Sequence, residues 1–210
     1  FGPGSSRTKT GRESMTKTVE FFYDFGSPTV YLAATQLPTI AGPVGATIDW
    51  RPMLLGGVFK STGNQSPVVV APKAAYMNDD LQRFAKRYGV PFRFNPHFPI
   101  NTLALMRGAV AYQADAVVSS TYREAIFTAI WVGAQNLNKS DVIQQVLRDA
   151  GLDPAELMIR IGQQTVKDQL IANTKEAVNR GAFGAPTFFV GDQMFFGQDR
   201  LDFVAEVLRG

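Results

Sequence analysis

Strand-like sequences lie near the two ends of this 210-residue chain, and helical patterns occupy the stretch between them. The first strand pattern, 19–25, is rich in aromatic and β-branched residues, and a second covers 46–50. Strand chemistry returns at 184–190 and, after a two-residue Gly-Asp turn, at 193–196. This arrangement predicts one sheet assembled from both ends of the chain and interrupted by helices.

The segment between the two N-terminal strands begins like a helix. Ser27 stands at an N-cap position and Pro28 at N1, where the missing N–H of proline costs nothing. Apolar residues follow at helical spacing until Pro38 or Gly42. A strand, a helix and a second strand in this order favour a parallel, right-handed connection.

Between residues 61 and 181 the apolar residues recur at helical spacing, and we interpret these stripes as packing between helices. Thr121 and Glu124 form a capping-box pattern that predicts a helix start. Ser140 and the pair Asp153-Pro154 predict two further starts.

Composition limits the chemistry that the chain can perform. It has no Cys and one His, so disulfides, thiolate metal sites and a redox dithiol of its own are excluded, and no metal site is expected. No run of about 18 apolar residues lacks a charge, which argues against a membrane span.

Residues 1–14 are rich in Gly and Ser and precede Met15, and we interpret them as a cloning remnant without ordered structure. Their three cations and one acid account for +2 of the formal net charge of +3. The basic pI therefore gives no support to a nucleic-acid partner. No secretory pattern follows Met15, so we expect a cytoplasmic protein.

Two positions could carry chemistry. At the junction of strand and helix, the Ser27 hydroxyl and the free N–H groups of the first turn face one point, which favours an anion and particularly a thiolate. The alternative is that Ser27 is an N-cap and nothing more. Pro186 belongs at the first residue of its strand, either as a cis peptide or as a trans edge proline.

Several strings resemble the 2-hydroxychromene-2-carboxylate isomerases, a family in the DsbA-like branch of the thioredoxin superfamily and close to the kappa-class glutathione transferases. The opening string is FYDFGSP at 22–28, the closing strings are FGAPTFFVGD at 183–192 and FFGQDRL at 195–201, and the middle pairs are Arg51-Pro52, Gly63-Asn64 and Pro72-Lys73. The resemblance implies a thioredoxin-like (DsbA-like) α/β domain built from 15–60 and 182–210, with an all-helical domain inserted at 61–181.

The resemblance also implies glutathione as cofactor. Ser27, which stands where redox relatives carry their first Cys, would donate a hydrogen bond to the thiolate. Ala185, before a cis Pro186, would pair with the cysteinyl backbone of glutathione. The remaining contacts fall to two pairs: Gln198 and Asp199 at the γ-glutamyl end, and Asn64 and Lys73 at the glycine end.

The second substrate would lie between the two domains, where the family carries pocket residues at the positions of His97 and Phe98. Phe98 replaces a Tyr of the family pattern, and Asn101-Thr102-Leu103 replaces a run that contains Arg, so the identity of the substrate stays open. His97 is either an acid–base group or a hydrogen-bonded loop histidine. Phe59, Met53 and Trp131 either wall the pocket or pack in the core.

The resemblance predicts a homodimeric, glutathione-dependent isomerase of aromatic catabolism that converts a cis aromatic pyruvate to its trans isomer through thiolate addition. A kappa-like transferase or peroxidase, which consumes glutathione, is the first alternative. A non-catalytic DsbA-like module that binds peptides is the second. A serine hydrolase is disfavoured because the chain lacks a Gly-x-Ser-x-Gly elbow and has one His.

Overall fold

A mixed sheet of four strands organises the part of the chain that the computed structural model describes, residues 17–210. Its order is β2-β1-β3-β4, with bounds β1 Thr18–Tyr23, β2 Thr47–Pro52, β3 Thr187–Val190 and β4 Gln193–Phe196. β1 pairs in parallel with β2 and antiparallel with β3, which pairs antiparallel with β4. The predicted assembly of one sheet from both ends of the chain is confirmed. Residues 1–14, interpreted above as a cloning remnant, lie outside the described residues.

Both central strands, β1 and β3, are buried on their two faces, which explains why they read as unbroken runs of aromatic and β-branched residues. On β1, Phe21 packs toward the larger core and stacks on Phe188 with ring centroids 4.9 Å apart. The next residue, Phe22, points to the opposite face and packs with Phe189 in a smaller cluster. This alternation is the period-2 geometry of a strand.

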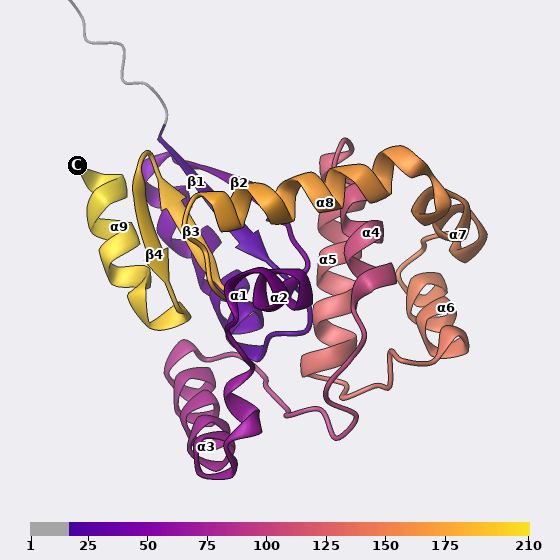
Figure 1. The fold of residues 1–210 in the computed structure, drawn as a ribbon, viewed down its shortest axis with the longest axis horizontal. Helices are drawn as coiled ribbons and strands as arrows, with labels where there is room; N and C mark the ends of the chain where they lie inside the picture. The colour runs from indigo at the N-terminus through magenta and orange to yellow at the C-terminus, as the bar shows by residue number, and fades with distance from the viewer. Residues whose placement is uncertain (1–16) are drawn as a thin grey trace, which may run out of the picture.

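Helices cover both faces of the sheet and continue beyond it (Figure 1). α1 and α9 pack together on one face of the sheet. α2 and α8 pack against each other near the opposite face. The α-helices of the described residues are α1 Pro28–Ala41, α2 Leu55–Thr62, α3 Ala71–Tyr88, α4 Leu103–Ala111, α5 Ala116–Trp131, α6 Ser140–Asp149, α7 Pro154–Gly162, α8 Gln164–Asn179 and α9 Leu201–Arg209. Short 3-10 turns lie at η1 Gly42–Val44, η2 Pro67–Val69 and η3 Gln198–Arg200.

The structure corrects two predicted helix starts. α5 begins at Ala116, because the Asp115 carboxylate accepts hydrogen bonds from the N–H groups of Val117 and Val118, so Thr121 lies inside the helix and not at its N-cap. Ser140 is the first residue of α6 and does not cap it. The start at Asp153-Pro154 is confirmed, since the Asp153 carboxylate accepts from Ala155 N–H at 2.8 Å.

Of the two predicted ends of α1, the later one is confirmed: the helix runs through Pro38 to Ala41, with Gly42 as its C-cap. Helices α3 to α8 follow one another in the chain between β2 and β3, as the helical stripes indicate. The domain limits at 60/61 and 181/182 stay a prediction. Among the described residues, none of the helices has the length and apolar character needed to cross a membrane.

Candidate active site

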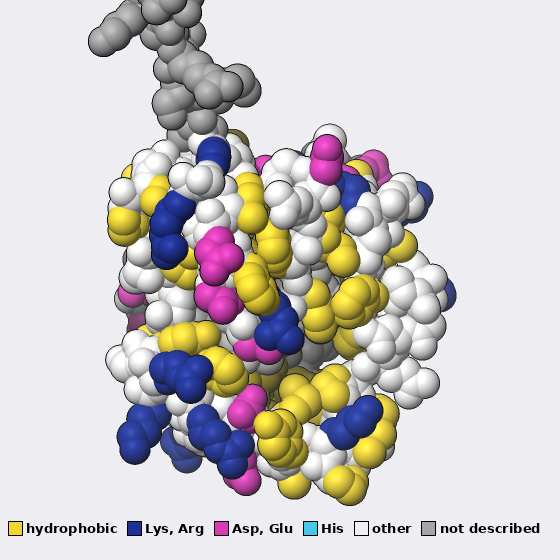
Figure 2. All heavy atoms as spheres, turned by 90° about the vertical axis from the view of Figure 1, so that its left-hand side faces the viewer, with side chains coloured by type: hydrophobic (Ala, Val, Ile, Leu, Met, Phe, Trp, Pro, Cys, Tyr) yellow, Lys and Arg dark blue, Asp and Glu magenta, His cyan; other side chains and the backbone are white. Residues whose placement is uncertain are grey.

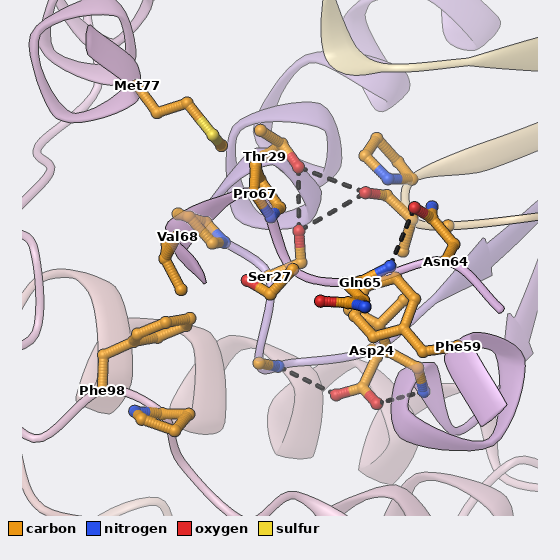
Figure 3. Close-up of a pocket in the computed structure, with 18 of the residues that line it drawn as sticks. Asp24, Ser27, Thr29, Phe59, Asn64, Gln65, Pro67, Val68, Met77 and Phe98 are labelled. Atoms are coloured by element: carbon orange, nitrogen blue, oxygen red, sulfur yellow. Dashed lines mark hydrogen bonds between the residues drawn. The ribbon is translucent and has the colours of Figure 1, made fainter. Parts of the chain in front are cut away.

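A cavity of about 640 Å³ lies where the two ends of the chain meet the helical segment. Its walls come from the turn between β1 and α1, from α2, from η2 and α3, from the loop 94–102, and from the residues before β3 and in η3. Figure 3 shows Ser27 and Thr29 on one side of this space, Met77 and Val68 on another, and Phe98 below them.

The Ser27 hydroxyl is held at the cavity wall by polar neighbours. Its Oγ lies 2.8 Å from Thr29 Oγ1 and donates weakly to the Ala185 carbonyl oxygen at 3.5 Å; the Thr29 hydroxyl donates to the same carbonyl at 3.3 Å (Figure 3). Ser27 is at the N-cap of α1 as predicted, but its side chain makes no capping bond. The hydroxyl is therefore not consumed by helix capping.

The first turn of α1 offers unfilled donors beside this hydroxyl. Pro28 has no N–H, and within residues 17–210 the N–H groups of Thr29 and Val30 find no acceptor. These groups form the positive end of a 14-residue helix, where an anion is stabilised by about 0.3–1 kcal/mol or more when partly buried. The hydroxyl and the free N–H groups together fit a thiolate better than a neutral thiol.

Asp24 is a buried carboxylate at the base of the same turn, and sequence reasoning missed it. Oδ1 accepts from Gly26 N–H at 2.9 Å and Oδ2 from Leu55 N–H at 2.8 Å, so the side chain ties the Ser27 turn to the start of α2. Burial raises the pKa of Asp24, against the lowering effect of its hydrogen bonds from Gly26, Leu55 and Thr102. The sequence did contain a signal for this role: Asp24 is an acidic residue directly after a buried strand and two positions before Gly26.

Residues from the C-terminal part of the chain complete the wall beside Ser27. The Ala185-Pro186 peptide is cis, as the resemblance implied, and both residues line the cavity. The Ala185 N–H has no acceptor among the described residues, while its carbonyl faces the two hydroxyls. An extended peptide can pair with such an edge as an added strand does.

Three more predicted site residues line the cavity, namely Asn64, Gln198 and Asp199. The Asn64 amide is already engaged, because Nδ2 donates to the Phe183 carbonyl at 2.8 Å and Oδ1 accepts from Gln65 N–H at 2.8 Å. Asp199 pairs with Arg200 at 2.9 Å, and both side chains are substantially exposed. This ion pair is therefore weak enough to rearrange for an incoming ammonium group.

Two predicted residues do not line the cavity. Lys73 lies exposed in the first turn of α3, although its neighbour Ala74 is part of the wall. His97 is exposed beside the cavity, and its ring makes no hydrogen bond among the described residues.

The apolar half of the cavity contains Phe98 and Phe94, whose ring centroids lie 5.5 Å apart, and Phe59 from α2. Trp131 and Met53 are fully buried and pack in the core instead of lining the wall.

Asp24 and Asp199 are the charged residues of the lining, in the part of the chain that is described. Cations lie outside the cavity: Figure 2 shows Lys and Arg side chains gathered over the lower part of one face, where α3 lies.

Comparison with known proteins gives one family model and relatives of two kinds, isomerases and kappa-class glutathione transferases. The family model of the DSBA-like thioredoxin domain matches residues 18–209. A 2-hydroxychromene-2-carboxylate isomerase of Sphingobium xenophagum is 34% identical over 198 residues, covering 92% of this chain and 99% of the relative. Glutathione S-transferase kappa 2 of Caenorhabditis elegans is 30% identical, covering 92% of this chain and 94% of the relative.

Comparison with solved structures gives similar relatives. A 2-hydroxychromene-2-carboxylate isomerase structure superposes with a TM-score of 0.78 at 28% identity, covering 91% of this chain and 94% of the other. A probable DsbA oxidoreductase from Streptomyces coelicolor, 19% identical, has a TM-score of 0.68 over 92% of this chain and 87% of the other, and supports the fold alone. The expected fold, a DsbA-like thioredoxin domain with a helical insertion, is confirmed.

Proposed function

Because the chain belongs to the DSBA-like thioredoxin family, within the group of the 2-hydroxychromene-2-carboxylate isomerases and kappa-class glutathione transferases, we propose that it is a glutathione-dependent isomerase of the 2-hydroxychromene-2-carboxylate type. One observation carries the proposal. The Ser27 hydroxyl lies beside the first turn of α1 with its free N–H groups, and Ser27, Thr29 and Ala185 together line a cavity of about 640 Å³. Such a site can activate an external thiol where the chain has none of its own.

Bound glutathione would supply a thiolate that adds reversibly to a conjugated carbon of a ring-opened aromatic pyruvate, so that a double bond becomes a rotatable single bond. The role of Ser27 is to donate a hydrogen bond to the sulfur, and the N–H groups of Thr29 and Val30 stabilise its negative charge. The Ala185 backbone pairs with the cysteinyl unit. Phe94, Phe98 and Phe59 hold the aromatic ring beside the sulfur.

Ser27→Ala tests this role. A hydrogen bond to a charged group contributes about 1.5–3 kcal/mol, so we expect kcat to fall about 10- to 100-fold. The bound glutathione thiol should also titrate at higher pH, followed by thiolate absorbance in the ultraviolet. The matched control is Ser120→Ala on the exposed surface of α5, which should change neither quantity. Unchanged turnover in Ser27→Ala would rule out the assigned role.

The transferase alternative has support from the kappa-class relatives, which match over most of the chain. The two reactions differ in the fate of the thiol. An isomerase regenerates it, so free thiol stays constant while the substrate turns over; a transferase consumes one thiol per electrophile, such as a chloro-dinitrobenzene. If calorimetry shows no binding at millimolar glutathione, both enzyme proposals fail and a peptide-binding module becomes the better one.

The cellular context of the proposal is aromatic catabolism in the cytoplasm by a homodimer. Fractionation of the native host and light scattering of the purified protein would test the last two points. The partner of the proposed isomerase is a small aromatic carboxylate, and the reaction requires neither nucleic acid nor a membrane.

A further inference from the structure

A second cavity lies away from Ser27, between α4, α6 and α7. Its volume is about 310 Å³, within the range of small-molecule sites. Apolar side chains from the three helices, among them Leu147, Leu157 and Ile161, form most of its wall. In Figure 1, α6 and α7 lie at the end of the molecule remote from α9 and β4.

Arg107, on α4, is the one charged residue that lines this cavity in the described chain. It makes no hydrogen bond, ion pair or cation–π contact with any described residue, in contrast to Arg160 nearby, which pairs with Glu156. Its Nε is buried without a partner, whereas neither terminal nitrogen is buried. A half-buried guanidinium without an acceptor loses hydration that nothing in the protein replaces.

The polar residues of the wall are neutral: Asn101, Asn138, Ser140 and Gln144. Ser140 is the first residue of the ten-residue helix α6, so the cavity also lies near the positive end of a helix. The acids of this region, Asp141, Asp153 and Glu156, do not line it. Among the described residues, the lining therefore combines one unpaired cation, neutral hydrogen-bonding groups and an extended apolar surface.

We propose that this cavity binds a small organic acid with an apolar body, an alkyl or aryl monocarboxylate. The carboxylate accepts from the terminal nitrogens of Arg107, whose planar fork suits two-point contact with two oxygens. The apolar body lies among Leu147, Leu157 and Ile161. The site is distinct from the one assigned to glutathione and does not depend on that assignment.

The two cavities share a wall, so the experiment must separate them. Asn101 lines the second cavity, while its neighbours Ile100 and Thr102 line the first. The Asn138 side chain joins them further, because Oδ1 accepts from Asn101 N–H at 2.8 Å and Nδ2 lies 3.4 Å from the Pro99 carbonyl.

The experiment is calorimetry with octanoate, at saturating glutathione, and with its neutral isostere octanamide. We expect one octanoate site, with octanamide at least about 10-fold weaker. Arg107→Met keeps the length of the side chain without its charge and should weaken octanoate at least about 10-fold. Arg107→Lys keeps the charge but not the two-point contact, so its affinity for octanoate should lie between those of wild type and Arg107→Met. Phe98 lines the first cavity and not the second, so Phe98→Ala should leave octanoate binding unchanged.

The proposal is overturned if octanoate does not bind, if octanamide binds as tightly, or if Phe98→Ala weakens octanoate as much as Arg107→Met does. Thermal melting checks that the variants fold. Should Arg107→Met not fold, Ser140→Asp places an acid in the same lining and must weaken octanoate by a similar factor.

Discussion

At the scale of single residues, the Ser27 site depends on how two hydroxyls share one carbonyl. Ser27 Oγ and Thr29 Oγ1 lie 2.8 Å apart, and both reach the Ala185 oxygen, Thr29 at the shorter distance. Thr29 therefore satisfies this carbonyl when Ser27 turns its proton toward a ligand. Thr29 is a positioning residue in this scheme and Ser27 the residue that touches sulfur.

Thr29→Val should accordingly have a smaller effect than Ser27→Ala. Loss of one neutral hydrogen bond costs about 1 kcal/mol, so we expect glutathione affinity to fall about 5-fold while kcat changes little. Calorimetry and steady-state kinetics measure the two quantities, and Thr29→Ser, which keeps the hydroxyl, should behave as wild type. If Thr29→Val lowered kcat as much as Ser27→Ala does, this division of roles would be contradicted.

At the scale of elements, the packing of the helical segment depends on a close approach between α4 and α5. Gly108 on α4 faces Tyr122 on α5, and a Cβ at this position would overlap the Tyr122 hydroxyl. That hydroxyl is fully buried and donates to the Leu105 carbonyl at 2.9 Å, so it cannot move without losing its partner. The glycine is required for space and not for its backbone angles.

Gly108→Ala should therefore destabilise the protein by about 2–3 kcal/mol through overpacking, in spite of the better helix propensity of alanine. Urea unfolding followed by circular dichroism gives the free energy of unfolding. Gly162→Ala, at the last residue of α7 where a Cβ meets nothing within 4 Å, serves as control and should change it by less than about 1 kcal/mol. Similar values for both variants would show that the contact between α4 and α5 is looser than described.

At the scale of the whole molecule, an ion network ties the sheet to the last helix of the insertion. Arg180, which follows α8, donates to both carboxylate oxygens of Glu20 on β1, at 2.7 and 2.9 Å, and its guanidinium lies 3.8 Å from the Phe189 ring centroid. Glu176 on α8 bridges Arg180 and Arg51. These pairs join segments far apart in sequence.

This network predicts part of the acid sensitivity of the fold. The hydrogen bond with Arg180 holds the pKa of Glu20 below its ordinary value of 4.5, with burial opposing. The folded state therefore favours the ionised form, so its stabilising contribution is present above about pH 4.5 and is lost as the pH falls through the lower folded value.

Glu20→Gln should lower the free energy of unfolding by about 1 kcal/mol at pH 7, and the difference from wild type should shrink below pH 4. Urea titrations at a series of pH values measure this, with the exposed Glu206→Gln as control. A difference that stays constant down to pH 3 would show that Glu20 does not carry the effect.

The sequence by itself determined the local elements and the motif-bearing parts of the site. The aromatic run of β1, the Ser27-Pro28 helix start and the Gly-Asp hairpin each follow from short-range preferences, and they appear as predicted. Local patterns placed the start of α5 too late. Asp115 caps the helix six residues before Thr121, the N-cap that the capping-box pattern predicted.

Tertiary structure alone decided which side chains share a cavity. Asp24 and Thr29 join the Ser27 site through contacts with α2 and with Ala185, 31 and 156 positions away, and no local preference encodes such pairing. Packing likewise leaves His97 outside the wall and Arg107 facing a second cavity. A residue's neighbours across the fold depend on how whole helices pack, which is a property of their summed surfaces and not of any short string.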